Sequence, residues 1–477
     1  MARVVVLGSG FAGHTAAMNL RRKLNKKHEV VVVTPQKKFG YIPSYIWVGI
    51  GKMTAEQTQF ELAPVYKKLG ITYVQALTKE IHPDKEEQFI IVEKSSDGKI
   101  EKINYDYLIN ATGPRNNYAA TPGLGPDGFT HSVCTPTHAE EAAKKYEEVI
   151  KKLEAGEKQR IVIGTGHGMA TCHGAAFEYI HNLAFDLEER GLLKNARIKW
   201  ISNEPYLGDF GVGGIIVSKG GYEISDKVFA ESSFVERGID WIVRAHVKEV
   251  TKDKIHYITV EGEEDSLEFD FAMLIPAFSG ADLKYIDKEG NDITANLCNP
   301  SGFLKVDADY EAAAKGFENW KAKDWPKTYQ TPTYPNLFAA GISFAPPHPI
   351  SKPLSAPDGT PIVASPPRTG MVAGIIGHTV AHNVIDLIHG RVPQHSASMA
   401  EFGAACVASM GNSLTKGQAM AISMFPVVPD YDRFSTGRDL SYTFGDMGLA
   451  GHWLKLILHY MFIYKMKAHP LWWIIPD

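Results

Sequence analysis

The sequence predicts an α/β protein built from two Rossmann-like halves and a C-terminal segment of different character. Two observations support this prediction. A strand that runs into a glycine-rich loop and then a helix occurs at the start of the chain and again from about residue 160. The end of the chain, by contrast, is rich in aromatic and basic side chains. A chain of 477 residues is long enough for two or three domains with a large core.

The first unit is a dinucleotide-binding pattern. Val4 to Leu7 is a short run of mostly β-branched residues, which is typical of a buried parallel strand. We expect a helix from His14 to about Asn25 and a second strand over 29–34. The loop between strand and helix reads GxGxxG and comprises Gly8, Ser9, Gly10, Phe11, Ala12 and Gly13. In this context the glycines let a pyrophosphate approach the helix N-terminus; the alternative is an ordinary βαβ turn.

One part of that pattern is missing. An acidic residue that binds the ribose is expected at the end of the second strand. Thr34 and Pro35 stand there instead, so the nucleotide is expected to be held differently from NAD. A later apolar strand ends in Ala111, Thr112, Gly113 and Pro114, where small residues let the backbone pass close to a nucleotide.

The second unit departs from the fingerprint. A strand over 160–163 enters the loop 164–168, but Met169 occupies the position of the third glycine. Helices are expected through Cys172 to about Glu189, over 137–156 and over 369–388. Strands are expected within 71–94 and at 105–113, 196–202, 239–250, 254–261, 268–276 and 336–342. The segments 39–51 and 344–368, which are punctuated by Gly and Pro, are expected to be loops.

Charge and cysteine usage exclude several classes of protein. The formal net charge of −4 argues against a nucleic-acid partner. The four cysteines show no CxxC spacing, so no metal site and no small disulfide scaffold is expected. The first strand begins almost at Met1 and no run of about 18 uncharged apolar residues occurs. We therefore expect neither a signal peptide nor a transmembrane helix.

The motifs around the cysteines resemble those of the sulfide:quinone oxidoreductases, a family of flavoproteins with two dinucleotide-binding domains. The resemblance is carried by CTPTHAEEA, CHGAAFEY, SNEPYLGDFGVGG, LCNPSGF, NLFAAGI, PPRTG, AACVASMG and the tail FIYKMK. It implies oxidation of hydrogen sulfide to zero-valent sulfur or polysulfide, with FAD as cofactor and a membrane quinone as electron acceptor. Three departures are Arg368 where the family often has Lys, Ile342 where many flavoprotein reductases have Asp, and Asp209 where some relatives have His.

The resemblance also implies the site residues. Cys172 and Cys406 are expected to be joined by a disulfide or a longer sulfur chain beside the flavin. Cys134 is expected to be a third redox cysteine, and whether it is linked covalently to the flavin stays open. Besides the first loop, FAD is expected to contact Thr34, Pro35, Ser44, Ala76, Ala111, Thr112, Gly113, Pro114, Gly302, Gly341, Ile342, Arg368, Thr369 and Gly370.

The assignments to single residues have ordinary alternatives. A thiol near a helix N-terminus has a lowered pKa, which favours a reactive Cys172, whereas free cysteines are often small buried apolar residues. Cys298 is expected to be such a small buried residue with a structural role. Glu178 and His138 match family residues suggested for proton transfer. Their alternatives are a solvated helix carboxylate and an exposed histidine at a helix start.

The tail from Leu449 to Asp477 is expected to form an interfacial helix that contacts a membrane. Apolar residues recur there at helical spacing beside Lys455, Lys465 and Lys467, which are expected to face lipid head groups. The alternative is a helix packed on the core of the protein itself. By position, the quinone pocket is expected to be lined by Phe344, Pro347, Leu458 and Trp472.

The expected domains are an FAD-binding domain over 1–118 and 296–390, a second Rossmann-like domain over 119–295, and a C-terminal region over 391–477. The protein is expected at a membrane surface with sulfide and quinone as partners, and self-association is left open. Competing functions are an NAD(P)H:quinone or disulfide reductase, the flavin subunit of a sulfide dehydrogenase, and a membrane-docked flavoprotein that signals without turnover.

Overall fold

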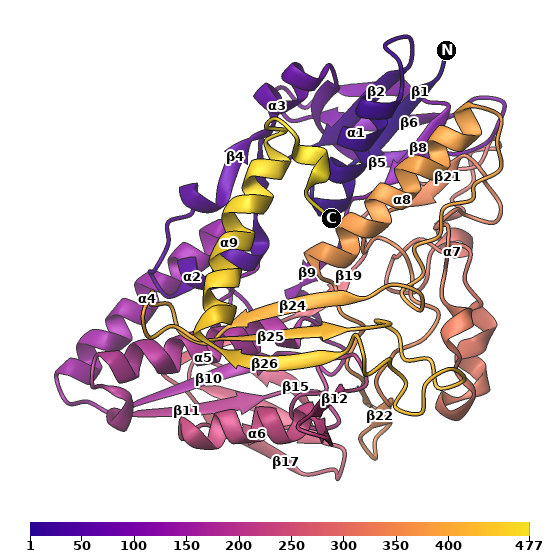
Figure 1. Ribbon diagram of the computed structural model, residues 1–477. Coiled ribbons are helices and arrows are strands. Elements are labelled where there is room, and N and C mark those ends of the chain that lie inside the picture. Colours follow the sequence, from indigo (N-terminus) through magenta and orange to yellow (C-terminus); the bar gives the residue numbers. More distant parts are fainter. Residues whose placement is uncertain (477) are drawn as a thin grey trace.

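The computed structural model describes residues 1–476 and is organised around two sheets that are largely parallel (Figure 1). The first sheet has the order β21-β8-β1-β2-β5-β6-β7. Its parallel strands are β1 (Arg3–Leu7), β2 (Glu29–Thr34), β5 (Thr72–His82), β8 (Tyr107–Asn110) and β21 (Leu337–Ala339). β6 (Phe89–Lys94) and β7 (Ile100–Asn104) continue it in antiparallel fashion. Strands that are more than 200 residues apart in the chain, β8 and β21, thus lie side by side in one sheet.

Two helices that are distant in sequence pack together against this first sheet. α1 (Phe11–Lys23) and α8 (Gly370–Ile388) cross so closely that a Cβ added to Gly377 would lie 2.4 Å from the Ala12 carbonyl oxygen. By length and composition α8 is apolar enough to cross a membrane, but 67% of its most apolar window is buried. Burial against α1 identifies α8 as a core helix.

The second sheet has the order β14-β11-β10-β18, and all its strands are parallel. They are β10 (Gln159–Thr165), β11 (Ala196–Ile201), β14 (Asp240–Ile242) and β18 (Phe271–Ile275), packed with α4 (Pro136–Glu154) and α5 (His173–Glu189). An antiparallel sheet of β15 (Ala245–Val250), β16 (Lys254–Thr259) and β17 (Glu264–Glu268) follows β14 along the chain. The predicted fold class, with two Rossmann-like units, is confirmed.

The C-terminal part forms a third body of structure. β24 (Ala404–Ser409), β25 (Ala419–Met424) and β26 (Phe444–Gly448) make an antiparallel sheet. α9 (Leu449–Met466) leads from this sheet to the N-terminal half, and η8 (Trp472–Ile474) follows near the chain end, beside α1 and α8 (Figure 1). The helix therefore bridges the two halves of the molecule.

Several short elements complete the fold. They are β3 (Lys38–Gly40), β4 (Gln59–Glu61), α3 (Leu62–Leu69), β9 (Arg115–Asn117), β12 (Ile216–Lys219), β13 (Tyr222–Ser225), α6 (Asp226–Glu236), β19 (Ala277–Ser279), β20 (Lys284–Tyr285) and α7 (Thr294–Leu297).

Four predicted segments differ from the observed secondary structure, and each difference has a local reason. α1 begins at Phe11 because Gly10, in extended conformation, serves as its N-cap. The segment 39–51 is not only loop, since burial of its aromatic residues supports η1 (Ile42–Ser44) and α2 (Tyr45–Gly49). Arg244, with φ +61°, divides the strand expected over 239–250. The proline-rich stretch 344–368 contains a small hairpin of β22 (Leu354–Ser355) and β23 (Pro361–Ile362).

Candidate active site

The first glycine loop is shaped to hold a phosphate group. Gly8 has φ +92°, and an added Cβ there would lie 2.3 Å from the Ala111 carbonyl oxygen. At Gly10 an added Cβ would meet nothing within 4 Å. In the described chain no side chain caps α1, and its first turn holds no acidic residue. Its first N–H groups are therefore available to an anion, which fits the pyrophosphate of FAD.

A second set of polar groups lies where α8 begins, against the same loop. A Cβ on Gly370 would lie 3.1 Å from the Phe11 ring. Arg368 Nε and Thr369 Oγ1 are buried without a hydrogen-bond partner within residues 1–476. The Arg368 guanidinium lies 4.0 Å from the centroid of the Phe303 ring, and its Nη1 donates to the Ile342 carbonyl over 2.6 Å. Buried polar groups of this kind are costly unless a ligand satisfies them, so they too fit FAD, the cofactor of this class of flavoprotein.

Other predicted cofactor residues meet at strand ends next to this loop. The Gly113 N–H donates to Ser343 Oγ over 2.8 Å, and Gly341 approaches Ala12 so closely that an added Cβ would lie 2.5 Å from it. The Thr112 hydroxyl donates to Asn110 Oδ1, while Pro114 follows on the same strand end. Gly302 packs against Gly280, where the nearest atom would lie 3.5 Å from an added Cβ. The two strand ends, β8 and β21, thus converge on the first loop.

The remaining predicted cofactor residues are already engaged within the protein. The Thr34 hydroxyl accepts from Ser9 Oγ over 3.2 Å at the place of the missing acid, and the Pro35 carbonyl accepts from Gln75. Ser44 Oγ is hydrogen-bonded to His459 Nδ1 of α9 over 2.8 Å. The Ala76 side chain is fully buried in β5.

The second glycine loop is closed by protein groups. The Gly168 N–H donates to His246 Nδ1 over 2.8 Å, and an added Cβ on Gly168 would lie 2.2 Å from the Pro361 carbonyl oxygen. α5 begins only at His173, several residues beyond the loop. Met169, at the third glycine position, is 42% exposed. This loop lacks the open cradle and the directly following helix N-terminus that a nicotinamide nucleotide needs.

The predicted redox cysteines come from three different elements. Cys172 is the N-cap of α5 and adopts φ +64°, a left-handed conformation that is uncommon for a residue other than glycine. It interacts electrostatically with Cys134, which lies just before α4. Cys406 lies on β24, which packs against α5. All three are half-buried free thiols, whereas Cys298 is buried. The bridge between Cys172 and Cys406 stays a prediction.

Burial dominates the acidity of these thiols. It raises the pKa of Cys172 to about 12, and it also raises the pKa of Cys134 and Cys406. The prediction that the helix N-terminus lowers the pKa of Cys172 was wrong, because removal of the thiolate from water outweighs the dipole. Arg368 acts in the opposite direction through its charge and through a hydrogen bond from its backbone N–H to Cys172.

Glu178 and Lys455 form a buried ion pair beside Cys406. Lys455 Nζ lies 3.0 and 3.1 Å from the two carboxylate oxygens, and each residue is 6% exposed. Burial raises the pKa of Glu178, while Lys455 lowers it. Both residues act electrostatically on Cys406. Glu178 is therefore not a solvated helix charge, and the structure places an ionisable pair next to a predicted redox thiol.

His138 lies in the first turn of α4, on the Cys134 side of the site. It is half-buried, its Nδ1 is a buried atom without a partner among the described residues, and its ring meets the Tyr118 ring edge-on at 6.3 Å. The exposed histidine that served as the alternative is not observed.

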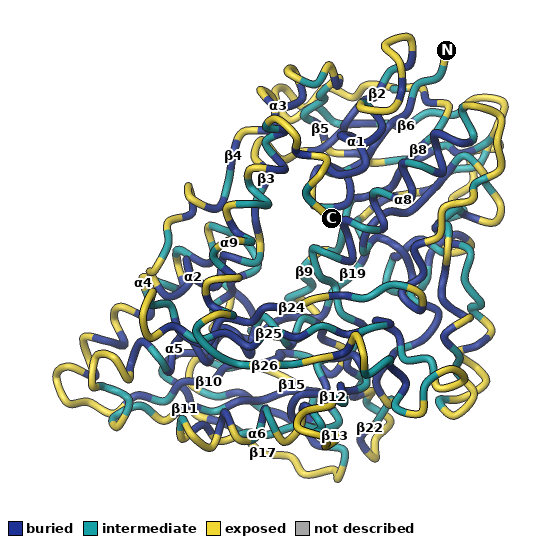
Figure 2. The backbone as a smooth tube through the Cα atoms, in the orientation of Figure 1, coloured by how far each residue is buried: buried dark blue, intermediate teal, exposed yellow. Residues whose placement is uncertain are grey.

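α9 is an amphipathic helix with its polar side turned inward. Its buried residues include His452, Lys455, His459 and Lys465. Its outer side carries exposed apolar and aromatic residues, and the colouring of Figure 2 alternates accordingly along the helix. We call this outer face, with the following turn, the apolar face: Trp453, Leu454, Ile457, Tyr460, Tyr464, Leu471, Trp473 and Ile474.

The expectation that the tail lysines face lipid head groups was wrong for two of them. Lys455 is paired with Glu178, and Lys465 is 2% exposed, with its ammonium 5.9 Å from the centroid of the Phe462 ring. Lys467 is half-buried, 5.7 Å from the centroid of the Phe60 ring.

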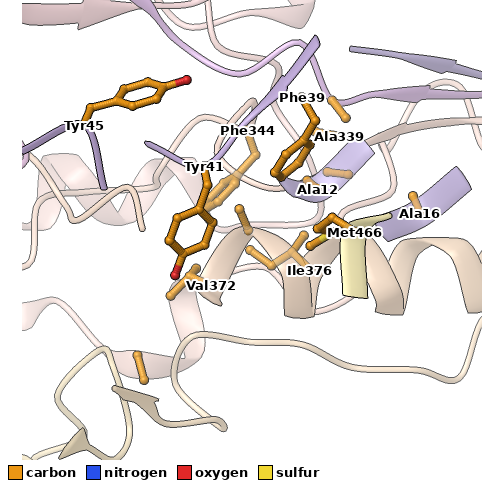
Figure 3. Close-up of a cluster of buried hydrophobic side chains, with 14 of the residues drawn as sticks. Ala12, Ala16, Phe39, Tyr41, Tyr45, Ala339, Phe344, Val372, Ile376 and Met466 are labelled. Atoms are coloured by element: carbon orange, nitrogen blue, oxygen red, sulfur yellow. The ribbon is translucent and has the colours of Figure 1, made fainter. Parts of the chain in front are cut away.

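The predicted quinone residues fall into two groups. Phe344 and Pro347 are buried on the loop after β21, and Figure 3 shows Phe344 in an apolar cluster with Tyr41 and Val372. A small cavity beside this loop is lined by Trp325, Ile342, Phe344, Pro346, Pro366, Pro367, Arg368 and Met399. Leu458 is half-buried on α9, and Trp472 is 6% exposed in η8.

Sequence reasoning missed several residues of the site. Tyr118 and Ser132 surround Cys134, and His459 ties α9 to Ser44. The short Ser-x-Cys spacing of Ser132 and Cys134 was a usable signal, since a serine hydroxyl often accepts from the backbone N–H two residues further on. No sequence signal could have paired Lys455 with Glu178, because the two are far apart in the chain.

Comparison with known proteins agrees with this geometry. Residues 2–173 match the family described as pyridine nucleotide-disulphide oxidoreductase. The chain is 29% identical to the sulfide-quinone reductase of Aquifex aeolicus over 97% of this chain and 91% of the relative. It is 26% identical to the mitochondrial sulfide:quinone oxidoreductase of Dictyostelium discoideum over 42% of each.

Solved structures give the same grouping. The crystal structure of the Aquifex aeolicus sulfide:quinone oxidoreductase superposes with a TM-score of 0.77 and 29% identity, over 98% of this chain and 92% of that one. Plasmodium falciparum NDH2 in complex with NADH shares the fold, with a TM-score of 0.65 and 14% identity over 99% of this chain and 97% of that one. In fold and over almost its full length, this chain is therefore similar to the sulfide:quinone oxidoreductase of Aquifex aeolicus, and its first third matches the pyridine nucleotide-disulphide oxidoreductases.

Proposed function

We propose that this protein oxidises sulfide and passes the electrons through FAD to a quinone at a membrane surface. The observation that carries the proposal is the pairing of an open first glycine loop with a closed second loop, beside three cysteines. An open FAD cradle without a nicotinamide cradle requires an electron donor other than NAD(P)H. Neighbouring thiols are suited to a sulfur donor.

The cysteines carry the sulfur chemistry in this proposal. Hydrosulfide attacks a sulfur bridge between Cys172 and Cys406; a new S–S bond forms on one cysteine as a persulfide, and the other leaves as a thiolate with the electron pair. A second hydrosulfide attacks the outer sulfur of this persulfide, so that a new S–S bond forms in the released polysulfide and the cysteine leaves as a thiolate. The two reduced cysteines then need a two-electron acceptor to re-form the bridge. FAD supplies a two-electron acceptor that quinone can reoxidise.

Polar residues of the site hold protons and charge. Arg368 donates its backbone N–H to Cys172 and presents a buried cation, which stabilises a thiolate there. Lys455 does the same beside Cys406, since its charge lowers the pKa of that thiol while Glu178 raises it; the raised carboxyl pKa of Glu178 suits this residue to accept and return a proton. His138 is the proposed proton-transfer residue beside Cys134.

The apolar face binds a lipid bilayer in this proposal. Aromatic and aliphatic side chains are exposed there while the lysines of α9 are turned inward, which is unfavourable in water and favourable at an acyl-chain boundary. A quinone dissolved in that bilayer reaches the flavin between α9 and the loop of Phe344, with Pro347, Leu458 and Trp472 lining the route. The lipid contact and the quinone route belong to the proposal.

The division of labour among domains is part of the same proposal. Residues 1–118 and 296–390 bind FAD, 119–295 supply Cys134 and Cys172, and 391–477 supply Cys406 and the apolar face. Placement of the predicted cofactor residues around the first loop supports this division.

Anaerobic spectroscopy of the flavin tests the function. Sodium sulfide should bleach the flavin absorbance of the purified holoenzyme within the mixing time of a stopped-flow experiment, and decylubiquinone should restore it. NADH at the same concentration should leave the spectrum unchanged. Rapid bleaching by NADH together with no response to sulfide would assign the protein to the NAD(P)H-dependent reductases instead.

A further inference from the structure

Cys134 lies at the end of a short chain of hydroxyl groups. The Tyr118 hydroxyl donates to Ser132 Oγ over 2.7 Å, and the Cys134 backbone N–H donates to the same oxygen over 3.1 Å. Ser132 is 1% exposed, so water does not compete for it. Both hydroxyl groups also lower the pKa of the Cys134 thiol, so each favours its ionised form.

The two donors fix the direction of the chain. A serine hydroxyl has two lone pairs and one proton. With Tyr118 and the Cys134 N–H as donors, both lone pairs of Ser132 Oγ are occupied, which leaves its own proton available for a further acceptor. A buried hydroxyl proton without an acceptor is costly, and the Cys134 sulfur belongs to the residue whose backbone N–H already binds this oxygen.

We propose that Ser132 donates its hydroxyl proton to the Cys134 sulfur and that Tyr118 holds Ser132 in this orientation, so that the pair stabilises Cys134 as a thiolate. Each of the other two predicted redox thiols has a cationic neighbour, Arg368 for Cys172 and Lys455 for Cys406. At Cys134 the proposed stabilisation of the thiolate comes instead from two hydroxyl groups in series, those of Tyr118 and Ser132. Hydrogen bonds in series polarise one another, which strengthens the last donor.

The surroundings of Cys134 set how it responds to pH. Burial raises the pKa of the Cys134 thiol, and Ser132 and Tyr118 lower it. The titratable groups that face this cluster are Cys172 at the start of α5, His138 in the first turn of α4, and Asp127, which acts on Tyr118.

One consequence rests on the proposed function. A Cys134 thiolate can attack a persulfide on the neighbouring Cys172, so that the outer sulfur moves to Cys134 and Cys172 leaves as a thiolate. One S–S bond forms and one breaks, and no external oxidant or reductant is needed.

The pH dependence of thiol alkylation tests the proposal without any turnover. Reduced holoenzyme is pulsed with iodoacetamide at several pH values, and each cysteine peptide is quantified by mass spectrometry. Ser132→Ala should slow alkylation of Cys134 about tenfold below its midpoint and move that midpoint to higher pH by about one unit. Tyr118→Phe should shift it in the same direction by less, and Ser132→Thr, which keeps a hydroxyl, should restore the wild-type profile.

Internal and matched controls separate this effect from misfolding. Cys298 in the same digests should keep its rate in every variant. Tyr105→Phe removes a hydroxyl that donates to the His82 carbonyl in the first half, and it should leave the Cys134 profile unchanged. If Ser132→Ala does not fold, Tyr118→Phe decides alone.

Two outcomes would overturn the proposal. One is a wild-type Cys134 profile in folded Ser132→Ala and Tyr118→Phe. The other is a Cys134 that carries no free thiol in the reduced enzyme, because the hydroxyl chain would then have no thiolate to stabilise. Failure of sulfide to bleach the flavin would reject the proposed function and leave these profiles unaffected, so the two failures are distinguishable.

Discussion

Cys172 and Cys406 are the residues on which the proposed sulfide oxidation depends. We expect Cys172→Ala and Cys406→Ala each to abolish sulfide-dependent quinone reduction while FAD stays bound, because each removes one end of the sulfur bridge. Cys134→Ala should lose turnover only in part. Steady-state reduction of decylubiquinone by sulfide, with flavin content from absorbance, measures both effects.

The matched control for these variants is Cys298→Ala. Cys298 is buried and packs in the core of the first half, so its replacement should leave turnover intact. Near-normal turnover of Cys172→Ala would remove the central step of the proposed chemistry.

The buried pair of Glu178 and Lys455 gives a second prediction at this scale. Lys455→Met leaves an unpaired carboxylate in the interior, and we expect it to reduce the free energy of unfolding by about 3–5 kcal/mol near neutral pH. The pKa of Glu178 should rise further, because the lysine that lowers it is gone. Urea denaturation at pH 5 and at pH 8 measures the free energy of unfolding of the variant and its dependence on pH. The loss of stability relative to wild type should be smaller at pH 5, where the Glu178 carboxyl is more readily protonated.

The double variant Glu178→Gln with Lys455→Met tests the cause. It removes both charges, so most of the lost stability should return. A double variant as unstable as Lys455→Met would show that the packing of the lysine stem, rather than the unpaired charge, is responsible.

At the scale of elements, α9 combines an inner polar side with the apolar face. A truncation after Asp446 would be a poor test of membrane binding, because it also uncovers Glu178 and removes the residues that pack on β24 and β25. Substitutions confined to the apolar face leave those contacts in place. Ile457 is 59% exposed and Trp473 is 43% exposed, so both are suited to replacement.

We expect Ile457→Asp combined with Trp473→Ser to abolish cosedimentation with liposomes and to lower the rate with decylubiquinone. Flavin bleaching by sulfide should persist, because the cysteines and the FAD cradle are untouched. Tyr222→Ser, which removes a 76% exposed ring from β13 in the second half, is the control and should change neither. Full cosedimentation of the double variant would reassign the apolar face to a contact between protein copies.

On the scale of the whole molecule, His14 connects the FAD helix to the tail. Its Nε2 donates to the Met466 carbonyl over 2.7 Å, and its Nδ1 accepts from the Tyr66 hydroxyl over 2.9 Å. Burial lowers the pKa of His14 to about 4, against 6.5 for an ordinary histidine. A pKa that is lower in the folded state contributes stability that is complete above about pH 6.5 and is lost as the pH falls towards 4.

We therefore expect the free energy of unfolding to fall between pH 6.5 and pH 4, with His14 contributing roughly 3 kcal/mol of the change. His14→Asn should flatten this part of the profile, although it lowers stability at pH 7. His256→Gln, on β16 of the second half, should keep the wild-type slope. If the free energy of unfolding of His14→Asn fell with pH as steeply as that of the wild type, the acid sensitivity would belong to other buried groups. Denaturant titrations at a series of pH values provide the measurement.

The fold class and the cofactor cradle were available from the sequence alone. A β-branched strand, a GxGxxG loop and a helix are local in the chain, and their geometry follows from backbone conformations that few residues other than glycine adopt. Gly8, with its positive φ, is where the sequence predicted a tight turn. Periodicity likewise predicted the helix of the tail.

Only the tertiary structure decided which groups are buried together. Their pKa values, and the side of each helix that faces the core, follow from that burial. Helical spacing placed Lys455 and Lys465 on α9, but it could not show which side of that helix faces the core, since both sides carry apolar residues. Packing of α9 against β24 and β25 turned Lys455 inward to Glu178. Position near a helix start suggested an acidic Cys172 thiol, yet desolvation, which depends on atoms from distant segments, raised its pKa. Burial is a property of the folded chain, so the local sequence does not determine it.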